Sequence, residues 1–242
     1  MSSPIRIARW WVRDYLSAAG SLIAGVASRD DPEQYRSGSK RPAVVIPGVY
    51  ETWHFMRPVV RALHDHGHPV FVLPLLRRNS LPVLEGAALV SDFVREQGLD
   101  DVFVAAHSKG GLIGKYAMLN LDPDGRLGRM VAIATPFSGS RYANYAPNRT
   151  LRAFRANDPV TRMLNVEDRV NDRIVSVFGE FDPVIPESSV LPGAENIRLV
   201  GAGGHFRIIG HPVTIATVLA EAAKPARFPP GDESGGRSGG AR

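Results

Sequence analysis

The sequence predicts an α/β protein with a mostly parallel sheet of about six strands and helices on both faces. Apolar, β-branched runs are typical of buried strands, and they occur at 43–46, 69–73, 102–106, 130–134, 174–178 and 196–200. Helix-like segments alternate with them at 56–66, 82–97, 109–120 and 212–223. Such alternation favours parallel pairing, because each helix carries the chain back across one face of the sheet.

The chain of 242 residues is expected to hold one large domain between two terminal segments. We expect an amphipathic helix and a linker over 1–40, the α/β domain over 41–223, and a disordered tail rich in Pro, Gly, Ser and Arg over 224–242. One connection, about 137–172, is far longer than a usual strand-to-helix link. It is predicted to fold into short helices over the sheet edge, as a lid.

Residues 5–27 have the spacing of an amphipathic helix. One predicted side carries Arg6, Arg9 and Arg13, and the opposite side carries Ile7, Trp11, Tyr15, Ala18 and Leu22. A helix packed on the domain is the first interpretation, and a helix lying on an anionic membrane surface is the second. A signal peptide is disfavoured, because the stretch is long, rich in Arg and Trp, and contains Asp14.

Composition excludes several classes of site. The net charge of +5 resides in residues 1–41 and 224–242, whereas 42–223 holds 18 basic and 18 acidic residues, so no nucleic-acid partner is expected. The chain has no cysteine, which excludes disulfides, cysteine nucleophiles and thiolate metal sites. No apolar run approaches the ~20 residues of a membrane-spanning helix. We expect a cytoplasmic protein, or alternatively one associated peripherally with a membrane through residues 5–27.

A candidate nucleophile, Ser108, stands in Ala106-His107-Ser108-Lys109-Gly110, between the strand at 102–106 and the helix at 109–120. A sharp strand-to-helix turn exposes a serine hydroxyl above a sheet, and it needs small residues two before and two after the serine. Gly110 meets this requirement, and Ala106 replaces the usual first glycine. His107 is expected to pack beside the turn rather than to act as a base.

A serine hydroxyl needs a base to take its proton and an anion to orient that base. Functional groups gather at the carboxyl ends of parallel strands, where Asp182 follows the strand at 174–178 and His205 follows the strand at 196–200. The chain order Ser108, Asp182, His205 is the order that a serine nucleophile on this kind of turn requires. Glu180 is the rival acid, and His211, which precedes Pro212 at a predicted helix start, is interpreted as structural.

Attack on a carbonyl group creates an oxyanion, which backbone N–H groups must stabilise. The amide of Lys109, directly after the nucleophile, is one expected donor. The amide of Val49 is the other, in the loop Pro47-Gly48-Val49-Tyr50 after the first strand.

Together these motifs resemble the α/β-hydrolase superfamily, and within it the serine lipases and esterases, over about residues 41–223. The resemblance rests on five motifs: Ile46-Pro47-Gly48 with Trp53, Ala106-His107-Ser108-Lys109-Gly110-Gly111, Thr135-Pro136-Phe137-Ser138-Gly139-Ser140, Asp182 with Pro186, and Gly204-His205-Phe206. It implies the α/β-hydrolase fold and cleavage of esters through an acyl-serine, without a metal or cofactor. The first strands of the full fold are missing, and the helix at 5–27 stands before the sheet instead.

The expected function is therefore a serine carboxylester hydrolase, lipase- or esterase-like, acting on a small-molecule or lipid ester with a hydrophobic acyl group. Acyl transfer and cofactor-free perhydrolysis on the same fold are alternatives, and a non-catalytic binding module is a third. Apolar side chains of the insertion could line an acyl pocket or join the core: Phe137, Tyr142, Tyr145, Leu151, Phe154, Met163 and Leu164. Its arginines could bind an anionic head group or form a solvated face: Arg141, Arg149, Arg152, Arg155 and Arg162.

Overall fold

The computed structural model describes residues 4–27 and 30–224, and within the first of these ranges the side chains of residues 7–20. Its centre is a six-stranded, all-parallel sheet in the order β2-β1-β3-β4-β5-β6. The strands are β1 (Ala43–Ile46), β2 (Val70–Val72), β3 (Val102–His107), β4 (Leu127–Ile133), β5 (Ile174–Phe181) and β6 (Glu195–Gly203). The predicted fold class is confirmed, and the predicted tail beyond residue 224 lies outside the described residues.

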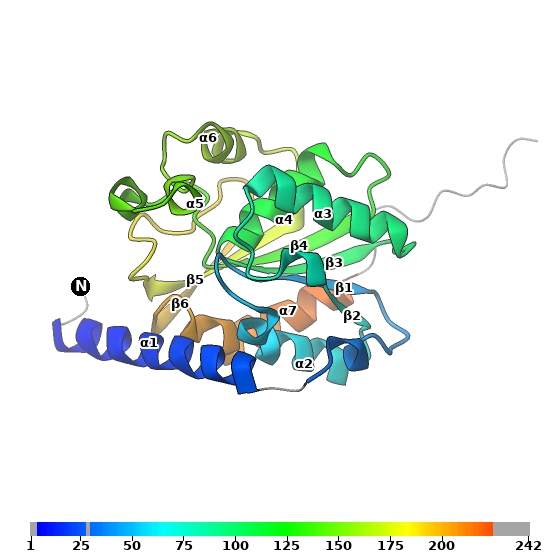
Figure 1. Cartoon of the computed structure of the whole chain (residues 1–242), viewed down its shortest axis with the longest axis horizontal. Coiled ribbons are helices and arrows are strands. Elements are labelled where there is room, and N and C mark those ends of the chain that lie inside the picture. Colours follow the sequence, from blue (N-terminus) through cyan, green and yellow to red (C-terminus); the bar gives the residue numbers. More distant parts are fainter. Residues whose placement is uncertain (1–3, 28–29, 225–242) are drawn as a thin grey trace, which may run out of the picture.

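Helices cover both faces of the sheet (Figure 1). The helices α3 (Val83–Glu96) and α4 (Lys109–Asn120) pack together on one face, and α2 (Arg57–Asp65) and α7 (Pro212–Ala223) on the other. Alternate residues of a strand point to opposite faces, so Val44 of β1 joins the core under α3 and α4, whereas Val45 joins the core under α2 and α7. Burial on both faces explains why the strands read as continuous apolar runs.

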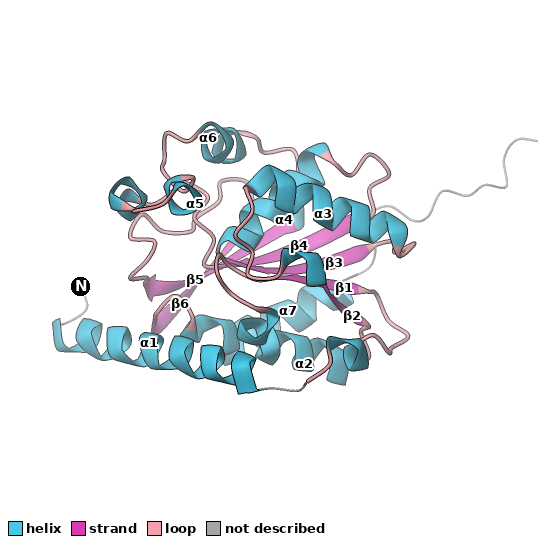
Figure 2. Ribbon diagram, in the orientation of Figure 1, coloured by secondary structure: helices cyan, strands magenta, loops and turns pink. Residues whose placement is uncertain are grey.

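The long connection between β4 and β5 contains short helices, as predicted. They are η4 (Arg141–Tyr145), α5 (Arg149–Arg152), α6 (Pro159–Val166) and η5 (Asn171–Arg173). Figure 2 shows α5 and α6 on the side of the sheet that carries α3 and α4. The insertion is tied to α4, because the Lys115 Nζ donates a hydrogen bond to the Leu164 carbonyl oxygen at 2.5 Å. Its action as a lid stays a prediction.

Residues 5–27 are helical, as α1 (Pro4–Ala27), and this helix packs on the domain. It contacts β6 and two short helices, η2 (Trp53–Met56) and η6 (Arg207–Gly210). Figure 1 shows it running along the domain beside the ends of β5 and β6. No helix among the described residues is both long enough and apolar enough to cross a membrane.

The predicted packing face of this helix is wrong for two of its largest members. Trp11 and Tyr15 are exposed, whereas Trp10, Asp14 and Ala18 are buried; the Leu22 and Arg6 side chains lie outside the described residues. The cause lies in the partner surface. Trp10 stacks on Phe181, with ring centroids 6.2 Å apart, and occupies the space that a Cβ at Gly203 would fill. A periodicity of apolar residues cannot reveal such a fit.

Candidate active site

Ser108 occupies a sharp turn between β3 and α4, as predicted. Its φ of 51° and ψ of −119° are unusual for a residue with a side chain. The Ser108 amide still donates to the Ile133 carbonyl oxygen of β4 at 2.8 Å, which fixes the turn to the sheet. Strain at this position is maintained by the surrounding structure and directs the hydroxyl away from the strand.

The first turn of α4 approaches the sheet so closely that only glycine fits. A Cβ at Gly110 would lie 2.2 Å from the Ile46 carbonyl oxygen, and one at Gly111 would lie 2.0 Å from the Thr135 Oγ1. Ala106, in contrast, is completely buried within β3, where a methyl group is accommodated. The departure from glycine at this position is therefore compatible with the turn.

The structure brings Ser108, His205 and Asp182 into one hydrogen-bonded chain. The Ser108 Oγ lies 3.0 Å from the His205 Nε2, and the His205 Nδ1 lies 2.8 Å from the Asp182 Oδ2. The three residues stand at or just past the carboxyl ends of β3, β5 and β6. The other carboxylate oxygen of Asp182 accepts hydrogen bonds from the amides of Val184 and Ile185 at 2.7 and 2.9 Å, and these bonds fix the orientation of the carboxylate.

The rival residues have other partners. The Glu180 carboxylate accepts from the Gly201 amide at 2.9 Å, within the bulged pairing of β5 and β6. His211 caps the first turn of α7, where its Nδ1 accepts from the Val213 amide at 3.3 Å. The structural interpretation of His211 is thereby confirmed.

Burial and charge act in opposite directions on this chain of residues. Burial by itself lowers the pKa of His205, but the nearby Asp182 carboxylate, with Glu51 and Asp14, raises that pKa above its ordinary 6.5. Burial by itself raises the pKa of Asp182, but His205 and the amides of Val184 and Ile185 hold that pKa below its ordinary 3.8. The site therefore stabilises an imidazolium beside an ionised carboxylate.

Asp14 reaches the loop of His205 from α1, a contact that the sequence does not predict. Its Oδ2 accepts from the His205 amide at 2.8 Å, and its Oδ1 accepts from the amides of Phe206 and Arg207 at 2.7 and 2.9 Å. Gly204, at φ 120°, allows this approach, since a Cβ there would lie 2.5 Å from the Asp14 Oδ1. The only sequence signal was an acid within an otherwise apolar and basic helix.

A second buried pair, Glu51 and His107, lies beside the site and was also not predicted. The His107 Nδ1 lies 2.9 Å from the Glu51 Oε2, and its Nε2 lies 3.1 Å from the His205 carbonyl oxygen. Each ring nitrogen of His107 therefore faces an oxygen that can accept a hydrogen bond. His107 thus packs beside the turn, as expected, and also holds the backbone of His205.

The same Glu51 carboxylate organises the loop after β1, where the Val49 amide is expected to bind an oxyanion. It accepts from the Gly48 amide at 2.8 Å. Since Gly110 lies against the carbonyl oxygens of Ile46 and Pro47, this loop meets the N-terminus of α4, where the Lys109 amide stands. The roles of Val49 and Lys109 stay predictions.

The Lys109 side chain turns away from the site and into the protein. Its Nζ donates to the carbonyl oxygens of Asn79 (2.9 Å) and Leu81, and burial lowers its pKa to about 8. Asn79 in turn donates from Nδ2 to the Pro47 carbonyl oxygen at 2.7 Å. The side chain after the nucleophile thus supports the loop that leads to Val49.

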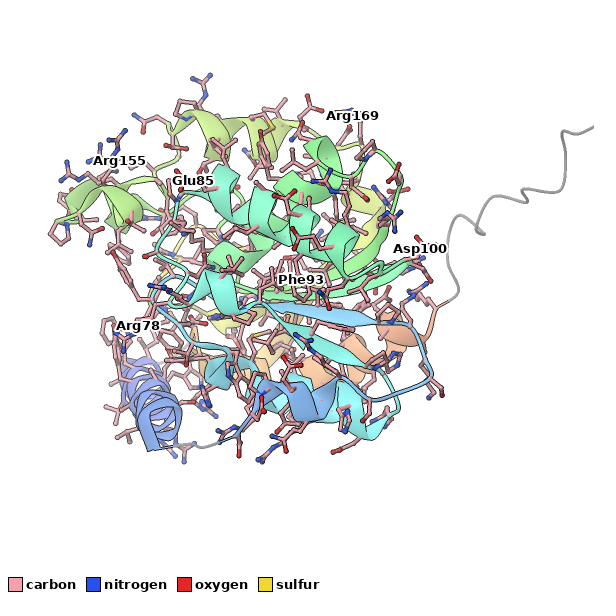
Figure 3. The ribbon with its side chains drawn as sticks, turned by 45° about the vertical axis from the view of Figure 1, so that its right-hand side comes forward. Arg78, Glu85, Phe93, Asp100, Arg155 and Arg169 are labelled. Atoms are coloured by element: carbon pink, nitrogen blue, oxygen red, sulfur yellow. The ribbon has the colours of Figure 1, made fainter. Side chains whose placement is uncertain are left out.

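The hydroxyl at the centre of the site is almost covered, since Ser108 is 6% exposed and His205 is 3% exposed. A hollow of about 440 Å³ borders Asp182 from the side of Tyr142 and Pro186. In Figure 3, α1 and the segment with Arg155 lie on the same side of the molecule, with α1 below Arg78 and Arg155 above it.

Among the described residues, no group of three or more His, Asp and Glu side chains could hold a metal ion.

Neither a protein-family model nor a curated protein matches the sequence. A mature lipase of Bacillus licheniformis, BlEst2, has a TM-score of 0.61 and 16% identity, over 79% of this chain and 96% of that one. A structure from the work on the metagenome-derived lipolytic enzymes LipS and LipT has a TM-score of 0.59 and 16% identity, over 78% of this chain and 95% of that one.

A third similar structure is the carboxylesterase CesB of Bacillus subtilis, with a TM-score of 0.51 and 15% identity over 88% of this chain and 98% of that one. Such likeness at low identity concerns the arrangement of strands and helices. Together with the six parallel strands and the strained serine after β3, it identifies the architecture: this chain has the α/β-hydrolase fold.

Proposed function

We propose that the protein is a serine carboxylester hydrolase. The observation that supports this most strongly is the hydrogen-bonded chain from the Ser108 hydroxyl through His205 to Asp182. Three side chains separated by 97 and 23 positions along the sequence have the separations that proton transfer requires. The fold shared with lipases and esterases supports the same activity.

In the proposed reaction, the Ser108 Oγ attacks the ester carbonyl carbon while the His205 Nε2 takes the hydroxyl proton. The oxyanion of the tetrahedral intermediate accepts hydrogen bonds from the amides of Val49 and Lys109, each worth about 10²–10³ in rate. The intermediate collapses, and the leaving alcohol takes the proton from His205. Water then attacks the acyl-serine by the same route and releases the acid, while Asp182 stabilises the imidazolium in both halves.

The structure favours the core over an acyl pocket for part of the insertion. Phe137, Phe154 and Leu164 are buried in the cluster that includes α4, whereas Tyr142 and Tyr145 are exposed. Several of the arginines have protein partners: Arg141 pairs with Glu187 at 2.6 Å, and Arg152 and Arg155 donate to backbone carbonyl oxygens. These contacts disfavour a head-group role for those three residues.

A panel of p-nitrophenyl esters of increasing acyl length, together with a fluorophosphonate probe, tests the proposal. The wild type is expected to hydrolyse at least one ester and to be labelled once. Ser108→Ala should lose labelling and at least about 10⁴-fold in kcat/KM, whereas the control Ser138→Ala should retain both. No turnover on any ester, together with no labelling of Ser108, would reject the proposal.

Acyl transfer and perhydrolysis share the same acyl-serine, and the near-complete burial of Ser108 and His205 favours testing them beside hydrolysis. Product analysis with an alcohol or hydrogen peroxide as acceptor separates the three reactions. A dominant ester or peracid product would replace hydrolysis as the main activity.

A further inference from the structure

The outer face of α1 is an apolar ridge that the domain leaves uncovered. Val12 and Leu16 are 61% and 65% exposed, and Trp11 and Tyr15 beside them are exposed with ring centroids 5.1 Å apart. These four residues, hereafter the α1 ridge, lie at helical spacing and form one continuous strip. Large contiguous apolar surface of this kind marks an interaction site more often than scattered exposed residues do.

The ridge is held rigidly, because the opposite face of the same helix is anchored. Trp10 and Ala18 are buried against the domain, and the buried Asp14 accepts three backbone hydrogen bonds from residues 205–207. The domain therefore presents Trp11, Val12, Tyr15 and Leu16 outward as a fixed feature of the folded state.

The exposed charged side chains that α1 itself places beside the ridge are both arginines. Over the described side chains of residues 7–20, Arg9 and Arg13 are exposed, and the single acid, Asp14, is buried on the other face. Arg13 also borders a groove of about 440 Å³ between α1 and η6, which Leu16, Phe55 and Phe206 line and at which Arg207 lies. Apolar side chains beside two arginines are complementary to an anionic amphiphile.

We propose that the α1 ridge and this groove dock the protein on an anionic lipid membrane. Trp and Tyr side chains are suited to the membrane–water interface, because they combine a large apolar body with one polar group. Arg9 and Arg13 on the same helix attract anionic head groups, and this attraction adds to the binding free energy from burial of the apolar strip. Phe206 and Arg207 follow His205 directly, so docking brings the lipid phase next to the candidate active site.

Flotation of the full-length protein with vesicles tests this proposal independently of any esterase activity. One set of vesicles contains phosphatidylcholine with about a third phosphatidylglycerol, and the other contains phosphatidylcholine only. The wild type is expected to bind the anionic vesicles at least tenfold more tightly, and rising salt should weaken that binding. Equal recovery with and without vesicles would overturn the proposal.

Two double variants separate the apolar and the electrostatic parts. W11S/L16S should lose at least tenfold in affinity for the anionic vesicles, and R9Q/R13Q should lose a similar factor on anionic vesicles only. The control L75S/V200S, in which two apolar residues outside α1 that are at least as exposed as Trp11 and Leu16 are replaced, should bind as the wild type does. If the control loses as much as W11S/L16S, the ridge is not the docking surface and the proposal is wrong.

Trp fluorescence and sedimentation complete the test. Vesicle binding should shift the Trp emission maximum to shorter wavelength. A shift that persists in Trp53→Phe and disappears in Trp11→Phe would support insertion of Trp11, and Trp11→Phe should still bind. Circular dichroism melting verifies that each variant is folded. If the wild type fails to bind vesicles and sediments as a dimer that W11S/L16S converts to a monomer, the ridge joins two copies of this chain and membrane docking is rejected.

Discussion

The Asp14 carboxylate accepts a hydrogen bond from the backbone amide of His205 at 2.8 Å, although 191 positions separate the two residues along the chain. The same carboxylate binds the amides of the next two residues. Hydrogen bonds to a buried charged group are stronger than neutral ones, so α1 holds the loop of the candidate base in one conformation. The N-terminal helix is thus part of the support of the site.

Replacing Asp14 should therefore reduce activity without removing any group that touches the substrate. Asp14→Ala leaves three amides without their acceptor, and we expect kcat/KM to fall about 10- to 100-fold as His205 loses its position. Asp14→Asn removes the negative charge that helps to raise the pKa of His205, so the midpoint of its pH–rate profile should move to lower pH.

The exposed Ala19 provides a matched control on the same helix, and Ala19→Ser should behave as the wild type. Wild-type kinetics and an unchanged pH profile for both Asp14 variants would contradict the positioning role. A loss of thermal stability without any shift in the pH profile would indicate a structural role only.

The pH dependence of ester hydrolysis should report the raised pKa of His205. Only the neutral imidazole can take the serine proton, so kcat/KM should rise with pH and level off above a midpoint higher than 6.5. Asp182→Asn removes the strongest influence that raises this pKa; the midpoint should move to lower pH, and kcat should fall by about 10³–10⁴.

Glu180→Gln is the control for this experiment, because the Glu180 carboxylate accepts from the Gly201 amide at 2.9 Å and is not part of the hydrogen-bonded chain from Ser108 to Asp182. Its pH profile should match that of the wild type. A larger loss in Glu180→Gln than in Asp182→Asn would exchange the roles assigned to the two acids.

The buried pair Glu51–His107 should be thermodynamically coupled. Glu51→Gln leaves His107 without its charged partner and weakens the hold on the Gly48 amide, so the free energy of unfolding should fall by about 3–5 kcal/mol. His107→Gln should have a similar effect, because the buried Glu51 carboxylate then loses its bond to the His107 ring and keeps the one from the Gly48 amide.

Chemical denaturation of both single variants and of the double variant gives the coupling energy. The loss in unfolding free energy of the double variant is expected to be smaller than the sum of the two single losses by about 0.5–3 kcal/mol. Additive effects within experimental error would mean that the two side chains act separately. Esterase assays on the same samples report whether the pair also positions His205.

Gly110 should not tolerate a side chain. A methyl group would meet the backbone carbonyl oxygen of Ile46 at 2.2 Å, and backbone cannot move aside as a flexible side chain can. Gly110→Ala should therefore destabilise the protein by about 1–3 kcal/mol and disturb the turn that carries Ser108.

Gly20 provides the contrasting helical glycine, since a Cβ there meets nothing within 4 Å. Gly20→Ala should leave activity unchanged and stabilise the protein by up to about 1 kcal/mol, because alanine favours a helix. Thermal unfolding of both variants checks the pair, and equal melting temperatures would refute the packing argument.

Much of the architecture was accessible from the sequence because it rests on local regularities. Strands buried on both faces are continuously apolar, and helices follow them, so six parallel strands could be predicted with small errors at their ends, as for β4, which begins at Leu127 rather than at 130. The sequence could also predict that Ser108, Asp182 and His205 meet. Each of them follows a strand, and parallel strands end at one side of the sheet.

Asp14, Glu51 and the packing face of α1 could not be found in this way. The Asp14 carboxylate binds backbone amides, which every loop possesses, and nothing in the sequence marks the three amides of residues 205–207 as its partners. Two faces of α1 carry large apolar residues, and periodicity alone does not choose between Trp10 and Trp11.

The sequence by itself determined the order of strands and helices and the residues that end at the carboxyl side of the sheet. Only the tertiary structure decided which face of α1 is buried and how Asp14, Glu51 and His107 support the loop of His205. The physical reason is that secondary structure follows from near neighbours along the chain, whereas a buried charge requires donors that come together only when distant segments pack.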